Sequence, residues 1–207
     1  IEDTTFENGG SESVNYDLYI NGSLSSTGSS DYVAYGTRMY GCSARIQGAS
    51  FADLDGQAVY TSDYYEGDYE LNTVSIENVG QGTENHSAIY LYNYSSSYPT
   101  NVYMTSVSIN TANTGSGLYA TATSYAAMDI EIIGLDIDGA AGDGVTLSGD
   151  TITAAISFAD IANADNLGLS SDEAELSFTD SSISASGTSG AELLSGEKLT
   201  FSNNTIT

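Results

Sequence analysis

One apolar template recurs along the chain and constrains its fold more than any other feature. Leu176, Phe178 and Ile183 follow the order apolar, one spacer, apolar, four spacers, apolar. The template fits five further segments and, shortened to two spacers, a sixth: Ala44/Ile46/Phe51, Tyr69/Leu71/Ile76, Val102/Met104/Ile109, Ile130/Ile132/Ile137, Leu199/Phe201/Ile206 and the short Ile156/Phe158/Ile161. The last residue of each copy is its anchor, and successive anchors are 25, 33, 28, 24, 22 and 23 residues apart. The chain therefore repeats about every 25 residues, which predicts a repeat architecture.

A second alternating segment follows most anchors, about eight to ten residues on. The two inward positions of each segment are two residues apart: Val59 and Thr61, Val145 and Leu147, Ala191 and Leu193, and, slightly shifted, Leu118 and Ala120, and Leu167 and Leu169. Alternation by twos is typical of a strand with one buried face. The linking segments, such as 139–144 and 186–190, are rich in Gly, Asn, Asp and Ser, which favours tight corners.

Short strands at this period, with no helical pattern, predict an all-β solenoid in which each turn stacks on the one before. The pattern resembles the right-handed parallel β-helix (pectate-lyase-like) superfamily. The resemblance implies about seven to eight turns of roughly 25 residues in a single domain, 1–207. Turns are expected to be less regular in 1–43, where Phe6 and Leu24 are the candidate anchors, and regular in 44–207. The alternative is a sandwich of antiparallel hairpins, which the near absence of two-residue hairpin loops disfavours.

The charge is strongly unbalanced, with 28 Asp and Glu against 3 Lys and Arg, a net formal charge of -25. Three cations cannot neutralise the phosphates of a nucleic-acid backbone, so nucleic-acid binding is excluded. No apolar run reaches the ~18 residues of a membrane helix, so no membrane insertion is expected. Cys42 is the only cysteine and is expected to be a buried small apolar residue. The chain begins at Ile1, as a processed protein or a segment of a longer one would.

The Asp-rich segment 134–144 is the one stretch that suggests chemistry. Asp136, Asp138 and Asp143 resemble the clustered aspartates of polygalacturonase-like hydrolases, but the Arg-x-Lys and His-Gly elements of that family are missing. Asp136 and Asp138 flank the inward Ile137, so both are expected to face solvent. Calcium bound by Asp136, Asp138 and Asp143, with corner carbonyls near Asp138, Asp143 and Asp150, is an alternative. The single histidine, His86, is expected to be a surface loop residue. The sequence therefore predicts no catalytic residue, no cofactor-binding residue and no metal ligand.

Tyrosines crowd the middle of the chain and suggest a contact surface, because a tyrosine ring offers a large apolar area with a polar tip. They are Tyr60, Tyr64, Tyr65, Tyr69, Tyr90, Tyr92, Tyr94, Tyr98, Tyr103, Tyr119 and Tyr125. Glycan stacking on this flank is one interpretation, and filling of solvent-facing strand positions is the other. Four triplets have the form of glycosylation acceptors, at Asn21, Asn85, Asn93 and Asn203, which is compatible with secretion.

Together these features favour a non-enzymatic structural protein, secreted or on the cell surface. The last turn, 199–207, has no polar cap, and uncovered strand edges invite pairing. Either the chain continues beyond Thr207 within a longer solenoid, or another copy covers this end. We therefore expect a homo-oligomer or polymer, as in a surface layer, sheath or filament, or a segment of a longer β-helix. An adhesin or carbohydrate-binding β-helix is the alternative, and a polysaccharide lyase or hydrolase is the weakest of the three hypotheses.

Overall fold

The computed structural model describes residues 18–25, 36–39, 43–63, 67–80, 86–95, 97–194 and 198–207. These residues form eighteen strands and no helix, so the described part of the chain holds no helical segment of the kind that crosses a membrane. Phe6, Cys42, Tyr64, Tyr65 and Asn85 lie outside the described residues.

Two parallel sheets make up the molecule. The 11-stranded sheet contains β1 (Leu18–Ser25), β3 (Ser43–Leu54), β5 (Gly67–Val79), β7 (Thr100–Ala112), β9 (Met128–Ala140), β11 (Ile152–Ser157), β12 (Asp160–Ala164), β14 (Glu175–Thr179), β15 (Ser182–Ser184), β17 (Leu199–Ser202) and β18 (Thr205–Ile206). The 7-stranded sheet contains β2 (Thr37–Met39), β4 (Val59–Asp63), β6 (Ile89–Asn93), β8 (Leu118–Ala122), β10 (Val145–Ser148), β13 (Leu167–Asp172) and β16 (Ser189–Leu194).

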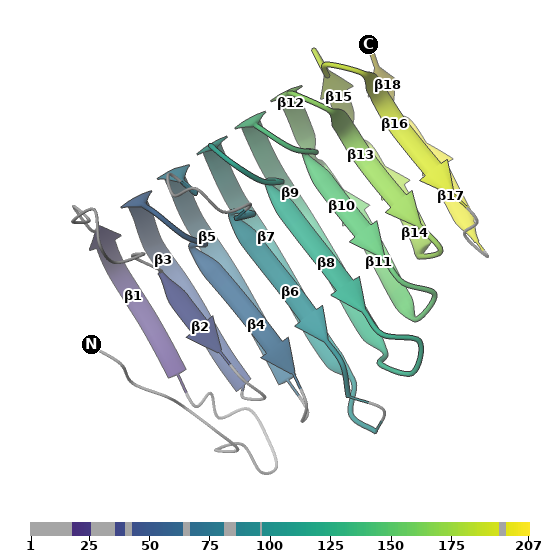
Figure 1. The fold of residues 1–207 in the computed structure, drawn as a ribbon. Helices are drawn as coiled ribbons and strands as arrows, with labels where there is room; N and C mark the ends of the chain where they lie inside the picture. The colour runs from purple at the N-terminus through teal and green to yellow at the C-terminus, as the bar shows by residue number, and fades with distance from the viewer. Residues whose placement is uncertain are drawn as a thin grey trace.

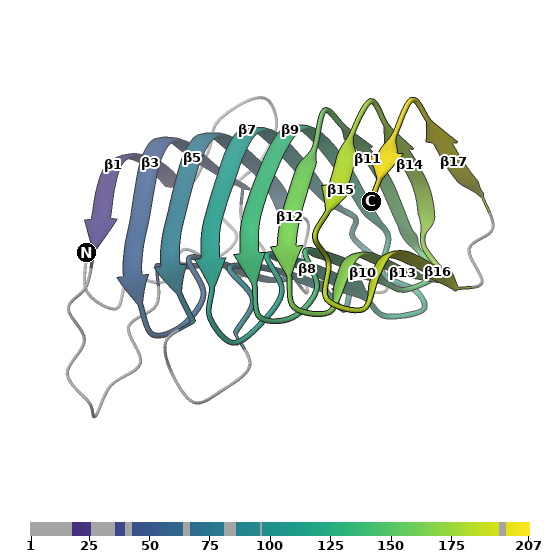
Figure 2. The same ribbon diagram turned by 90° about the horizontal axis from the view of Figure 1, so that it is seen from above.

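Each strand pairs with its equivalent in the next turn of the chain. The first sheet runs in the order β1-β3-β5-β7-β9-β11-β14-β17, and the second from β2 through β4, β6, β8, β10 and β13 to β16 (Figure 1). The bent strands of the first sheet arch over the second sheet (Figure 2). The fold is thus a parallel β-solenoid of about six turns, close to the predicted seven to eight. The antiparallel sandwich is excluded for the described residues, because their strand pairs are parallel.

The anchors predicted from the sequence stack in one continuous row along the solenoid. The row runs Leu24, Phe51, Ile76, Ile109, Ile137, Ile161, Ile183 and Ile206, each paired with the next. From Phe51 to Ile183 these side chains are at most 1% exposed. Their burial in a single core is the main favourable term for folding, since apolar area removed from water contributes about 25 cal/mol per Å². The predicted period is confirmed turn by turn.

The predicted inward residues were wrong in two strands. In the first sheet the prediction lies two residues too late in the sequence, and in the second sheet it lies two residues too early. Ala154 and Ile156, not Ile156 and Phe158, pair with Leu176 and Phe178, so this turn keeps the full template and is not shortened. Phe158 is 63% exposed. In the second sheet, Leu169 and Ser171, rather than Leu167 and Leu169, pair with the following Ala191 and Leu193. In both turns a small inward residue, Ala154 or Ser171, hid the true register from a pattern based on large apolar side chains.

Two columns of left-handed residues set the bends of each turn. The first contains Gly48, Thr73, Ser106, Gly134, Phe158, Asp180 and Asn203, and the second, five residues later, contains Asp53, Asn78, Gly139, Asn163 and Ala185. A positive φ turns the chain sharply, and glycine accepts it without steric cost, as at Gly134 and Gly139. Side-chain amides link some of these corners along the axis: Asn78 Nδ2 donates to Asp53 Oδ1 at 2.6 Å.

Phe158 is the costliest of these left-handed residues, because a bulky side chain at a φ of 55° is strained and most of its ring is exposed. We expect Phe158→Gly to raise the free energy of unfolding by about 1 kcal/mol. Denaturant unfolding measures the change. Ala155→Gly, at an exposed position of β11, is the control and should lower stability, because glycine in a strand interior costs about 0.5–1 kcal/mol. Destabilisation by both variants would contradict the strain argument.

Candidate functional site

Three of the tyrosines form a continuous stack on the outer face of the second sheet. Tyr60 of β4, Tyr90 of β6 and Tyr119 of β8 occupy equivalent positions in three consecutive turns. The Tyr60 and Tyr90 ring centroids are 5.4 Å apart at 12° between planes, and those of Tyr90 and Tyr119 are 5.2 Å apart at 11°. The guanidinium of Arg38, one turn earlier, lies 4.6 Å from the Tyr60 centroid. We call Tyr60, Tyr90 and Tyr119 the tyrosine ladder.

The stacking decides what the ladder can contact. Both faces of Tyr90 lie against neighbouring rings, and Arg38 lies over one face of Tyr60, while Tyr60 itself stacks on Tyr90. A sugar ring binds an aromatic side chain by lying on the face of the ring. Both faces of the central Tyr90 are covered, so a sugar cannot stack on it. Burial, followed by the neighbouring Tyr119, Tyr60 and Tyr92, raises the pKa of the Tyr90 phenol. The ladder therefore stabilises the stack of turns and presents ring edges to solvent.

The other tyrosines whose side chains the structure describes lie on different parts of the solenoid. Tyr69 is 1% exposed and belongs to the core, whereas Tyr125 is 81% exposed at the corner after β8. Tyr92 stacks on Tyr94 at 5.3 Å, and Tyr94 and Tyr98 are exposed at the corner after β6. Tyr103 is exposed on the other sheet, in β7.

A shallow acidic groove crosses β5, β7, β9 and β12 of the 11-stranded sheet. Its volume is about 440 Å³, and its acidic lining residues are Glu77 of β5, Asp136 and Asp138 of β9, and Asp160 of β12. Asp136 and Asp138 are exposed on either side of the buried Ile137, as predicted. Asn163 Nδ2 donates to Asp138 Oδ1 at 2.6 Å. Ser182 Oγ likewise donates to Asp160 Oδ1, at 2.5 Å.

Asp143 does not join this groove. It lies in the corner between β9 and β10, where Thr146 Oγ1 donates to its Oδ2 at 2.9 Å and the Leu167 N–H donates to its Oδ1 at 3.3 Å. Asp143 therefore does not line the groove that Asp136 and Asp138 line. Within the described residues, no three Asp, Glu, His or Cys side chains converge as metal ligands would.

The raised pKa of Asp136 predicts how the stability of the folded state changes with pH. Partial burial, then the neighbouring Asp160 and Asp138, raises its pKa from the ordinary 3.8. The folded state then holds this proton more tightly than the unfolded state, so stability falls as the pH rises through the window just above 3.8. We expect Asp136→Asn to raise stability at neutral pH and to flatten this part of the curve. The test is to measure the urea concentration at the unfolding midpoint of the wild type and of Asp136→Asn at several pH values from acidic to neutral.

Asp150→Asn, in a turn outside the groove, is the control, because it removes one negative charge without removing the crowding. An equal gain in both variants would assign the effect to net charge alone and contradict the local origin.

His86 was expected at the surface, and this prediction was wrong. The residue is 5% exposed, in the corner that precedes β6. Its backbone N–H donates to Thr114 Oγ1 at 3.2 Å. Gly115 of the next turn makes this close approach feasible, because a Cβ there would lie 2.5 Å from the His86 carbonyl carbon. The sequence pattern did not show that His86 packs against the following corner.

Asn93 has the triplet form of a glycosylation acceptor, but its side chain is fully buried. The amide donates to the Ala127 carbonyl at 2.8 Å, and its oxygen accepts from the Ser95 N–H at 2.9 Å. No glycan can attach to this nitrogen in the folded chain. Asn203 is exposed and donates to Asp180 Oδ1 at 3.0 Å. Asn21 lies in β1.

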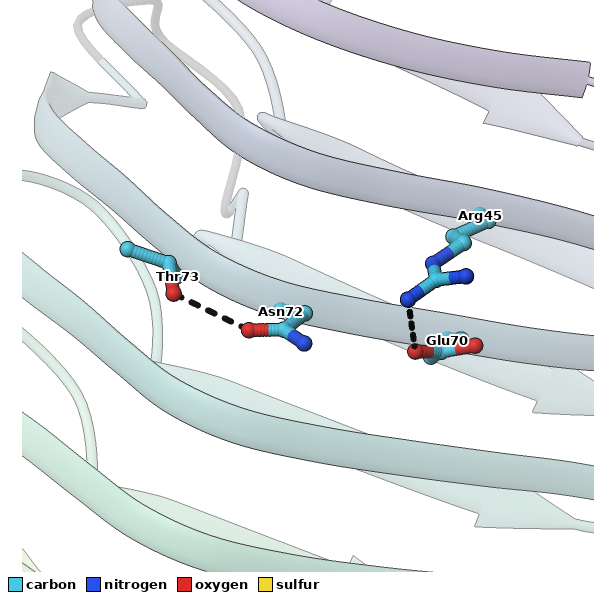
Figure 3. A network of polar contacts seen from close by, with 4 residues as sticks. All are labelled: Arg45, Glu70, Asn72 and Thr73. Atoms are coloured by element: carbon cyan, nitrogen blue, oxygen red, sulfur yellow. Dashed lines mark hydrogen bonds and ion pairs between the residues drawn. The ribbon is translucent and has the colours of Figure 1, made fainter.

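The three cationic side chains are engaged within the chain and do not gather. Arg45 pairs with Glu70 at 3.0 Å across β3 and β5, close to the contact in which Thr73 Oγ1 donates to Asn72 Oδ1 (Figure 3). Lys198 pairs with Glu175 at 3.0 Å, and Arg38 lies over Tyr60. The three cations therefore do not form a shared basic surface.

The comparisons add no relative on which a role for these surfaces could rest. No protein-family model matches the sequence, and neither the curated proteins nor the solved structures contain a significant match.

Proposed function

We propose that the protein is a non-catalytic structural component of the cell exterior that assembles end to end with copies of itself. In this proposal it is a non-enzymatic member of the pectate-lyase-like β-helices. The single observation that carries the proposal is the apolar row exposed where β16, β17 and β18 end the described solenoid, a face that either a continuation of the chain beyond Thr207 or another copy would cover. The strongly acidic composition is in keeping with a secreted or surface location.

Apolar side chains of the core row are exposed at this end. Leu199, Phe201 and Ile206 are 39%, 36% and 47% exposed, whereas their equivalents one turn earlier, Leu176, Phe178 and Ile183, are at most 1% exposed. The strands at this end also have one edge that no described strand pairs. Unpaired strand edges next to exposed apolar residues favour the addition of another turn of the solenoid, with its strands paired to these edges.

The charge distribution favours contact between copies through the end formed by β16, β17 and β18 over contact through the sides of the solenoid. The described residues of the last turn, 189–194 and 198–207, carry only Glu192 and Lys198, and Lys198 is paired with Glu175. The flanks carry most of the acids that make up the net charge of -25. Side-by-side packing would bring like charges together, while a contact on this end adds only the charges of Glu192 and Lys198 among the described residues of the last turn.

Light scattering after size-exclusion chromatography tests the proposal. We expect the mass to rise with protein concentration and with salt or divalent cations, because both screen the flanks. Phe201→Lys should keep the chain monomeric by placing a charge in the end face. Phe158→Lys is the matched control, because this phenylalanine is also exposed but lies on a side corner, and this variant should still assemble. A monomeric wild type at all concentrations and salt levels would refute the proposal.

An adhesin or carbohydrate-binding role is the second candidate, favoured by the exposed tyrosines at two neighbouring corners. Tyr94 and Tyr125 are exposed on two neighbouring corners. One hydrogen bond links these corners, because the Thr123 N–H donates to the Asn93 carbonyl. In this interpretation Tyr94→Ala and Tyr125→Ala abolish binding on a glycan array, while Tyr90→Ala has little direct effect, because both its ring faces are covered. A glycan array without binders would exclude the role.

A further inference from the structure

The tyrosine ladder places three phenols at a fixed separation on three consecutive turns. Its neighbouring rings are nearly parallel, with centroids 5.2 and 5.4 Å apart, and parallel backbone pairing holds the residues in register. All three side chains are half-buried, so their edges remain accessible to solvent. Groups held in this way react as though at very high local concentration.

We propose that the tyrosine ladder is a site of oxidative cross-linking, at which a one-electron oxidant joins neighbouring turns through dityrosine. The oxidant is of the peroxidase class, with hydrogen peroxide as the final electron acceptor. Each of two phenols loses one electron and one proton. The two radicals couple through a Cε carbon of each ring, and the Cε hydrogens then move to the oxygens to restore both phenols. The peroxide takes up the two electrons and two protons and becomes two waters.

The geometry favours coupling between turns over coupling between molecules. Parallel rings at this spacing need only a rotation about the Cβ–Cγ bond and a small approach to bring two Cε carbons into contact. A second molecule would have to bring its own tyrosine to the same edge across two acidic surfaces. Tyr90 is central, because it is adjacent to both Tyr60 and Tyr119. Since its pKa is raised, the phenol is protonated at neutral pH and releases its proton on oxidation.

The product would be a covalent staple along the solenoid axis. A bond between Tyr60 and Tyr90 closes a loop of about thirty residues in a protein whose single cysteine cannot form an internal disulfide. Such a loop restricts the unfolded chain, so the cross-linked protein is expected to melt several degrees higher than the untreated protein.

The test is treatment of the dilute full-length chain with a haem peroxidase and hydrogen peroxide, followed by unfolding, digestion and mass spectrometry. We expect a monomer lighter by two hydrogens for each bond. Cleavage after glutamate separates Tyr60 from Tyr90 at Glu66, Glu70, Glu77 and Glu84, so a linked peptide pair identifies the bond. Tyr90→Phe keeps a ring in the stack but cannot couple, so this linked pair disappears, and the share of monomer lighter by two hydrogens should fall roughly tenfold or more.

Tyr92→Phe is the matched control, because Tyr92 is the next outward residue of β6 and stacks on Tyr94 instead of on the ladder. It should leave the Tyr60–Tyr90 product unchanged. The proposal is overturned if the share of monomer lighter by two hydrogens is unchanged in Tyr90→Phe, if the Tyr60–Tyr90 product is also lost in Tyr92→Phe, or if the wild type yields only links between molecules through exposed residues such as Tyr125.

Discussion

Replacing Asp63 by alanine is expected to lower the free energy of unfolding by about 2–5 kcal/mol, which makes it one of the two most damaging single changes. Asp63 is fully buried at the corner between the sheets. Tyr69 Oη donates to its Oδ1 at 2.5 Å, and Thr100 Oγ1 donates to its Oδ2 at 2.8 Å. Alanine leaves these two buried hydroxyls without their acceptor, and each unsatisfied group costs about 1–3 kcal/mol. Chemical denaturation measures the loss.

A double-mutant cycle separates this network from simple loss of packing. Asp63→Ala and Tyr69→Phe remove the two partners of one hydrogen bond, so the double variant should lose less stability than the sum of the single losses. Asp129→Ala, at an exposed position of β9, is the control and should stay within about 0.5 kcal/mol of the wild type. Additive losses at Asp63 and Tyr69 would show that their contact is not energetically coupled.

The second large effect is expected at the anchor row. Ile137→Ala should lower the free energy of unfolding by about 2–5 kcal/mol, because it leaves a cavity in the densely packed core. Ile133→Ala is a close control, since both isoleucines lie in β9 but Ile133 is 43% exposed and Ile137 is fully buried. It should change stability by about 0.5 kcal/mol or less. Equal losses in the two variants would contradict the assignment of inward and outward faces.

The anchor row could be predicted from the sequence because large apolar residues mark it in every regular turn. Ile109, Ile137 and Ile161 recur at the period of the solenoid, and their pairing follows from that period alone. The outward position of Asp136 and Asp138 followed from the alternation around Ile137. Where the inward residue was small, as at Ala154, the pattern failed, and the nearby Phe158 was wrongly placed inside.

Contacts between distant residues could not be predicted. Asp63 and Thr100 are 37 residues apart, and Gly67 lies so close to their network that a Cβ would approach Asp63 Oδ2 to 2.8 Å. The burial of His86 likewise depends on Gly115 of the following turn. The crowding of tyrosines was visible in the sequence, but only the register shows that Tyr60, Tyr90 and Tyr119 stack. This register changes their interpretation from a binding surface to a ladder.

The central claim is that the end formed by β16, β17 and β18 is a contact face. Hydrogen exchange at low and high protein concentration, in low and high salt, tests it residue by residue. End-to-end assembly predicts that amides of these three strands exchange more slowly in concentrated, high-salt solution, because their free edges become paired. Exchange in β4, β6 and β8, which carry the tyrosine ladder, should not change. Protection that appears over the ladder, or nowhere, while β16 to β18 exchange as before would contradict the claim.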